Sequence, residues 1–129
     1  MRLVLDTNVI ISALLFDGAP ERLVRAVLSS SHQLVISTFI INETSRILSD
    51  KFKIPPETVE LLEQLLTEAE VVYFEPFLHI LGDEPDNRVL ETAVKGKAEY
   101  IVTGDKPLIA LNEHSGVKII TVREFLKYL

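Results

Sequence analysis

The sequence contains no cysteine, so neither disulfide bonds nor thiolate metal sites can form. It has no apolar run near the roughly 20 residues that span a membrane, and no basic-then-apolar leader precedes the first predicted strand. We therefore expect a soluble, cytoplasmic protein with no membrane segment.

Basic residues are also scarce and scattered. Thirteen lysines and arginines stand against nineteen acids, which gives a formal net charge of −6. Proteins that coat nucleic acid electrostatically depend on clustered lysine and arginine, so this composition argues against that class. An acidic protein can still act on nucleic acid where a bound metal ion reverses the local charge.

The 129 residues, 47% apolar and 25% charged, are typical of one globular domain over residues 1–129. Apolar runs rich in β-branched residues predict strands at residues 3–5, 34–36, 71–74, 101–102 and 117–120. Helical patterns lie between them at residues 9–16, 20–29, 39–49, 56–68, 85–95 and 122–128. This alternation predicts an α/β three-layer fold around a mainly parallel, five-stranded sheet.

Four acidic residues lie at the end of a predicted strand or in a neighbouring helix. Asp6 directly follows the first strand in LVLDTNVII, and Asp105 follows the fourth in IVTGDK. Asp86 opens the helix that leads to the fourth strand, and Glu43 lies in the helix after the second. Because ligands bind beyond the carboxyl ends of parallel strands, we expect the four side chains to converge there.

Three of these acids also have a purely structural interpretation. Asp6 and Asp105 are suited to cap the helices that follow them, and Asp86 to complement the dipole of its own helix. Together, however, clustered carboxylates without a basic partner raise one another's pKa unless a cation neutralises them. Oxygen ligands of this kind suit Mg²⁺ or Mn²⁺ rather than zinc, and the combination favours a metal site.

Glu43 has an unusual place on its helix. It lies four residues after Phe39 and four before Ile47, so it projects between two apolar side chains. The structural alternative is a weak pair with Arg46, three residues further on. Its apolar surroundings favour a functional role.

The same fragments resemble the PIN-domain family of nucleases, in particular its single-domain, VapC-like toxin branch. LVLDTNV with Asp6, NE with Glu43, PDNRVLETA with Asp86 and YIVTGDK with Asp105 follow the family's order and spacing along nearly the whole chain. The resemblance implies a Rossmann-like sheet and Mg²⁺- or Mn²⁺-dependent hydrolysis of RNA phosphodiester bonds. It also implies products with a 5′-phosphate and a 3′-hydroxyl, and a possible antitoxin partner.

Through this resemblance the catalytic role falls on Asp6, Glu43, Asp86 and Asp105. Asp6, Asp86 and Asp105 are the expected metal ligands, and Asp6 and Asp105 are the first choice for direct ligation. Glu43 and Asp86 either ligate through water or orient the attacking water. The sequence leaves these two roles open.

Two supporting positions and one departure complete the comparison. Asn8 and Thr103 fall where the family has polar residues that orient the acids. Many relatives carry a further acid two residues beyond the fourth one, whereas this chain has Pro107 there. A second metal ion would then be loosely held or absent, unless Asp83 or Glu84 compensates. The departure keeps a second function open, that of a PIN-fold interaction module with impaired catalysis.

Another alternative is a receiver-like signalling domain, which also places acids at strand ends. Such a domain needs a phosphorylatable aspartate on a middle strand, and residues 35–37 and 71–75 supply none. The predicted helix at residues 56–68 carries two adjacent columns of apolar side chains. Core packing explains them well, although so wide an apolar face could also serve a dimer or a partner peptide. With the apolar excess of a short chain, this leads us to expect a homodimer.

Overall fold

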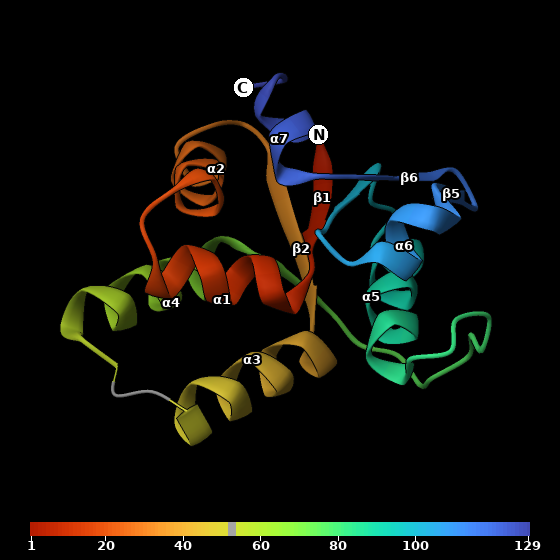
Figure 1. Cartoon of the computed structure of the whole chain (residues 1–129), viewed down its shortest axis with the longest axis horizontal. Coiled ribbons are helices and arrows are strands. Elements are labelled where there is room, and N and C mark those ends of the chain that lie inside the picture. Colours follow the sequence, from red (N-terminus) through yellow and green to blue (C-terminus); the bar gives the residue numbers. More distant parts are fainter. Residues whose placement is uncertain (52–53) are drawn as a thin grey trace.

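The computed structural model describes residues 1–51 and 54–129 (Figure 1). Its strands are β1 (Arg2–Leu5), β2 (Gln33–Ser37), β3 (Glu70–Val72), β4 (Tyr100–Val102), β5 (Glu113–His114) and β6 (Val117–Ile120). Its helices are α1 (Thr7–Leu15), α2 (Ala19–Leu28), α3 (Thr38–Lys51), α4 (Pro56–Glu68), α5 (Glu84–Lys95), α6 (Lys106–Leu111) and α7 (Val122–Leu126). In this described part of the chain, no helix combines the length and apolarity needed to cross a membrane.

The strands form one sheet in the order β3-β2-β1-β4-β6-β5. All neighbours pair in parallel except β5, which runs antiparallel to β6. The chain order reverses at β1, because β2 lies on one side of it and β4 on the other. In open α/β sheets, such a reversal marks the crevice where ligands bind. The expected parallel sheet is therefore confirmed.

The number of strands is a correction, because the sheet has six strands instead of the five expected. The additional strand β5 is only two residues long and forms a hairpin with β6. Its turn, Ser115-Gly116, has φ values of 50° and 82°, which suit the tight turns of two-residue hairpins. The six-residue helix α6 lies outside the six helical ranges predicted, although the capping interpretation of Asp105 assumes a short helix there. Both elements are too short for an apolar period to show.

Helices cover both faces of the sheet, which gives three layers (Figure 1). Helix α1 packs against α2, α3 and α4 on one side, while α5 packs on β1, β2 and β4. The central strands are apolar on both faces, and Leu3, Val4, Ile101 and Val102 are completely buried. Burial on both faces explains why these strands read as continuous apolar runs.

Helix α5 ends at Gly96, as its sequence predicts, and there it approaches the sheet closely. A Cβ atom on Gly96 would lie 2.3 Å from Cγ1 of Val35 on β2. The carbonyl oxygen of Gly96 also accepts a 3.0 Å hydrogen bond from Nε of Arg2. The absence of a side chain at this position therefore lets α5 pack on β2.

The apolar side chains of α4 pack mostly against the core of the same chain. Leu61 and Leu65 are buried, while Leu62 and Leu66 are partly buried and pack against the core. Core packing thus accounts for these columns, and homodimer formation stays a prediction.

Candidate active site

Asp6 and Asp105 leave the same edge of the sheet from neighbouring strands. Leu5 pairs with Val102 in the parallel register of β1 and β4, and the backbone N–H of Asp6 donates to the carbonyl of Val102 at 3.0 Å. Asp105 follows three residues after Val102. The register therefore brings together two acids that are distant in sequence.

Thr103 joins these two acids. Its hydroxyl group donates a 2.7 Å hydrogen bond to Oδ2 of Asp6 and accepts one from the backbone N–H of Asp105 at 2.9 Å. Thr103 is completely buried, so its hydroxyl is fixed by these contacts. The expected supporting position of Thr103 is thus matched by a direct contact with Asp6.

Asp86 reaches the site from the first turn of α5. Only 7% of Asp86 and 6% of Asp6 is exposed to solvent. In the described part of the chain, Oδ2 of Asp86 and Oδ2 of Asp105 are buried without a hydrogen-bond partner. Buried carboxylate oxygens are normally paired, so this pair of free oxygens requires an explanation.

Burial and proximity disturb the titration of these acids. The pKa of Asp86 is raised to about 7, first by burial and then by contact with the Asp105 carboxyl and its charge. Burial also raises the pKa of Asp6, against the hydrogen bond from Thr103, and the charges of Asp105 and Glu43 raise it further. The acids therefore lie close enough to oppose one another's ionisation.

The structure removes the capping interpretation for both strand-end acids. Asp6 and Asp105 occupy the N-cap positions of α1 and α6, but neither side chain makes a capping hydrogen bond. An N-cap side chain normally accepts from the N–H two or three residues later. These two carboxylates instead face the acid cluster.

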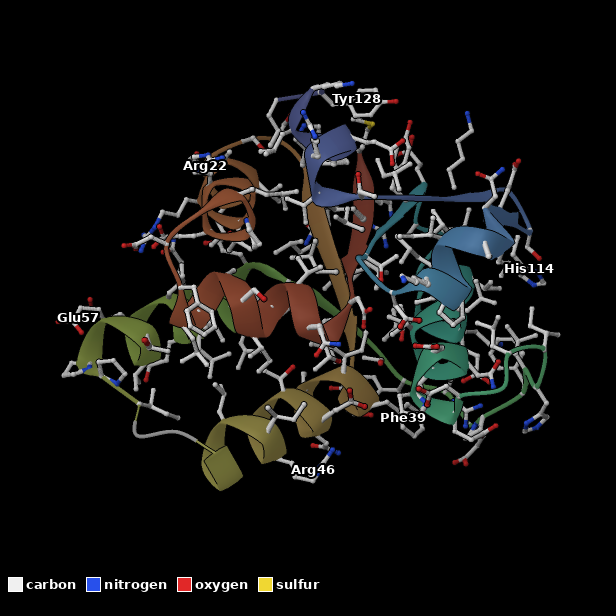
Figure 2. All side chains as sticks on the ribbon, in the orientation of Figure 1. Arg22, Phe39, Arg46, Glu57, His114 and Tyr128 are labelled. Atoms are coloured by element: carbon white, nitrogen blue, oxygen red, sulfur yellow. The ribbon has the colours of Figure 1, made fainter. Side chains whose placement is uncertain are left out.

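Glu43 borders the cluster from α3. It is half-buried and lines a cleft of about 250 Å³ whose walls also include Thr7, Phe39 and Arg88. Figure 2 shows Arg46 pointing away from the other helices, and no ion pair joins it to Glu43 among the residues described. The structural pair proposed for Glu43 is therefore wrong. A separate cleft of about 190 Å³, near Phe16, includes none of the four acids.

Comparisons with known proteins bear directly on this arrangement. The family model described as PIN domain matches residues 2–107, which is most of the chain. This chain belongs to the PIN-domain family. The matched region of this PIN domain contains all four acids and the strands β1, β2, β3 and β4.

The fold is similar to that of a solved structure. A chain in the crystal structure of VapBC2 from Rickettsia felis, bound to a DNA fragment from their promoter, superposes with a TM-score of 0.64. The identity is 14%, and the match covers 94% of this PIN domain and 98% of that chain. This likeness establishes the fold. Comparison with curated proteins finds no significant match.

Oxygen chemistry decides whether a metal ion fits this PIN domain. Within residues 1–49 and 54–129, no three histidine, aspartate or glutamate side chains already stand as a complete ligand set. The unpartnered oxygens of Asp86 and Asp105, however, need a cation or a proton between them. Since every candidate donor is oxygen, the residues fit a hard divalent cation such as Mg²⁺ or Mn²⁺.

The other positions that the sequence singled out lie outside the group formed by Asp6, Asp86 and Asp105. Asn8 is exposed, and among the described residues no hydrogen bond connects its side chain to the acids. Pro107 occupies the first turn of α6, where proline is favoured. Of the two compensating acids, Asp83 adds its charge to the field at Asp86, whereas Glu84 is engaged with Arg88 at 3.5 Å.

Two polar residues of α5, which the sequence did not single out, hold the loop that precedes this helix. The completely buried Glu91 accepts from the backbone N–H groups of Phe77 and Leu78 and pairs with Nε of Arg88 at 2.5 Å. One turn earlier, Asn87 exchanges two hydrogen bonds of about 3 Å with the backbone of Leu81. Both are completely buried polar residues on an amphipathic helix, and no local sequence pattern reveals their partners.

Proposed function

We propose that this PIN domain is a ribonuclease that hydrolyses phosphodiester bonds with Mg²⁺ or Mn²⁺. The observation that carries the proposal is the buried pair of unpartnered oxygens on Asp86 and Asp105, next to the equally buried Asp6. Buried carboxylate oxygens are normally paired, and a cation held between these two would pair both. A bound cation would remove the repulsion that raises the pKa of Asp86.

Each acid then has a task that follows from its position. Asp6, Asp86 and Asp105 would hold the ion, which supplies Lewis-acid activation of water and of the phosphate when bound. Thr103 keeps Asp6 in one orientation through its 2.7 Å hydrogen bond. Glu43, at the open side of the cluster, is placed to orient the attacking water or accept its proton.

The biological setting we propose is that of a VapC-like toxin acting on RNA in the cytoplasm, with an antitoxin protein as its partner. The fold likeness to a chain of the VapBC2 complex supports this setting. Two observations test it: inhibition of cleavage by the product of a neighbouring gene, and co-purification of the two chains. Cleavage that no such partner inhibits would limit the proposal to a nuclease without an antitoxin.

The decisive experiment is cleavage of a labelled single-stranded RNA by purified protein. We expect cleavage with Mg²⁺ or Mn²⁺, none with EDTA, and a 5′-phosphate on the downstream product. Asp6→Asn and Asp105→Asn should each lower the rate at least ~100-fold, because each removes a charge that holds the ion. Glu60→Gln, an exposed change on α4, is the matched control and should cleave normally. Undiminished cleavage by both site variants would refute the assignment.

A second candidate function is an interaction module with impaired catalysis. The observation in its favour is Pro107, which stands where many relatives carry a further acid. Pro107→Asp distinguishes the two functions. If the wild type is inactive and this variant cleaves RNA with Mg²⁺, the natural chain is the impaired module.

We also propose a homodimer, with the same surface used by both copies. The apolar side chains exposed on the described residues, such as Val59 on α4, are its candidate contacts. Light scattering at tens of micromolar should give twice the 14.5 kDa chain mass. A single 14.5 kDa species would refute the dimer.

A further inference from the structure

The cleft beside Glu43 connects the acid cluster to an aromatic wall. Phe39 lies four residues before Glu43 on α3, so both side chains project from the same side of the helix, and both line the cleft. Thr7, which follows Asp6 in sequence, lines it as well. Figure 2 shows Phe39 between the start of α3 and α5. Of the four acids, Glu43 alone lines the cleft, while Thr7 and Pro85 on its wall adjoin Asp6 and Asp86 in sequence. A substrate that extends from the acids into this cleft would meet Phe39.

The volume of the cleft limits what it can accept. At about 250 Å³ it is smaller than the ~300–1,000 Å³ pockets that enclose drug-sized ligands. Its walls include the apolar side chains of Ile40, Pro85 and Val89 in addition to Phe39. One planar group with two apolar faces suits this space, and a nucleobase is such a group.

Neighbouring rings and a cation hold the Phe39 ring in place. The Phe74 ring centroid lies 5.3 Å from that of Phe39, and Phe77 packs edge-on against Phe74 at 5.9 Å. The guanidinium of Arg88 lies 5.9 Å from the Phe39 centroid and is itself fixed by the buried Glu91. A fixed ring loses little freedom when a ligand stacks on it, which favours binding.

We propose that Phe39, through the ring face that Arg88 does not cover, stacks on a nucleobase of the RNA adjacent to the phosphodiester bond that is cleaved. The proposal rests on the ribonuclease function proposed above and names how its substrate is positioned. Because every base presents a π-face, such stacking positions RNA with little dependence on sequence. In a chain with few basic residues, stacking supplies binding energy that lysine and arginine clusters supply elsewhere.

The first test separates binding from chemistry with three variants. Phe39→Leu should raise the KM for single-stranded RNA about tenfold at unchanged kcat, and Phe39→Tyr should restore the wild-type KM. Phe74→Leu is the matched control for packing, because Phe74 supports the Phe39 ring but does not line the cleft, so its KM should rise less than that of Phe39→Leu. Equal KM increases in Phe39→Leu and Phe74→Leu would overturn the proposal, since the cluster would then act only through packing.

The second test changes the RNA, so its main result comes from the wild-type protein. Oligonucleotides that lack a single base are prepared for each position next to the cleaved bond. With wild-type protein, one position should raise KM about tenfold, and Phe39→Leu should add nothing further on that RNA. No position-specific loss with the wild type would overturn the proposal.

Failure of this inference is distinguishable from failure of the proposed function. If wild-type protein cleaves RNA but KM is the same for Phe39→Leu, the stacking role is wrong and the ribonuclease function stands. If wild-type protein neither binds nor cleaves RNA with Mg²⁺ or Mn²⁺, both are overturned.

Discussion

The hydroxyl group of Thr103 donates a 2.7 Å hydrogen bond to the carboxylate of Asp6, across the two central strands of the sheet. Both residues are buried, and the same hydroxyl accepts from the backbone N–H of Asp105. One oxygen atom thus fixes the orientation of Asp6 and the start of the turn that carries Asp105.

Thr103→Val tests this link, because it removes the hydroxyl and keeps the shape. An unpaired buried carboxylate oxygen on Asp6 should lower the free energy of unfolding by about 1–3 kcal/mol. Cleavage of RNA should fall as well, since Asp6 loses its fixed orientation. Denaturant unfolding at neutral pH measures the first effect, and Thr103→Ser is the control that should retain both properties. A Thr103→Val protein as stable and active as the wild type would show that the bond has no role.

The raised pKa of Asp86 makes stability depend on pH. Its pKa is about 7 in the folded protein, against an ordinary value of 3.8. Between these values the folded state binds more protons than the unfolded chain, so the free energy of unfolding of the metal-free protein falls as pH rises from about 4 to about 7. Each tenfold weakening of an acid by folding costs about 1.4 kcal/mol of stability once the group is ionised.

Asp86→Asn removes this penalty, because asparagine cannot ionise. Without metal, the variant should be more stable than the wild type at pH 8, by an amount on the order of a few kcal/mol, and nearly equal to it at pH 4. Melting curves at the two pH values measure the difference. NMR should also show a lower pKa for the Asp86 carboxyl in Asp105→Asn than in the wild type, because that variant lacks the neighbouring charge. A variant that melts lower than the wild type at pH 8 would show that the carboxylate stabilises α5 instead.

Metal binding should stabilise the wild type more than the Asp105→Asn variant. An ion that binds only the folded state stabilises it by about 2.7 kcal/mol at a concentration one hundred times its Kd. Mg²⁺ should therefore raise the Tm of the wild type well above its metal-free value, and that of Asp105→Asn only slightly. Glu60→Gln, remote from the acids, should respond like the wild type. Equal increases in wild type and Asp105→Asn would mean that the ion binds elsewhere.

The close approach of α5 to β2 predicts a sharp steric effect. Gly96→Ala would place a Cβ atom 2.3 Å from Cγ1 of Val35, so the Val35 side chain, the strand or the helix must shift. We expect a loss of about 1–3 kcal/mol in the free energy of unfolding, as for other overpacked sites. Gly82→Ala is the control, because no atom lies within 4 Å of a Cβ built there. Adding Val35→Ala to the Gly96 variant should recover part of the loss, whereas no recovery would point to a backbone cause.

The sequence predicts the centre of this fold better than its edges. Central strands are apolar on both faces, so β1, β2 and β4 stand out, and their parallel arrangement is enough to bring Asp6 and Asp105 together. The strand β5 and the helix α6 depend on turns and on packing against β6, and leave no periodic signal.

The surroundings of the acids depend on contacts that no local pattern contains. The pKa of Asp86 follows from how deeply α5 packs against the sheet and how near Asp105 lies. The Phe39 ring on the wall of the cleft is supported from behind because the loop after β3 returns Phe74 to Phe39, 35 residues away in the sequence. That path is fixed by hydrogen bonds to Glu91 and Asn87, whose partners the sequence does not reveal.

The position of β1 has a consequence for when the protein becomes active. It precedes the other five strands of this sheet in sequence, yet it lies in the middle of the sheet, and Asp6 at its end bonds to a residue 97 positions later. A nascent chain that has not reached Asp105 therefore lacks both the strand that completes the crevice and one of the three proposed ligands. Closing so long a loop costs conformational entropy, and this cost is offset only when β4 pairs with β1. Under the proposed function, a chain could therefore cut RNA only after β4 and Asp105 have been synthesised, and a shorter nascent chain would spare the ribosome that makes it.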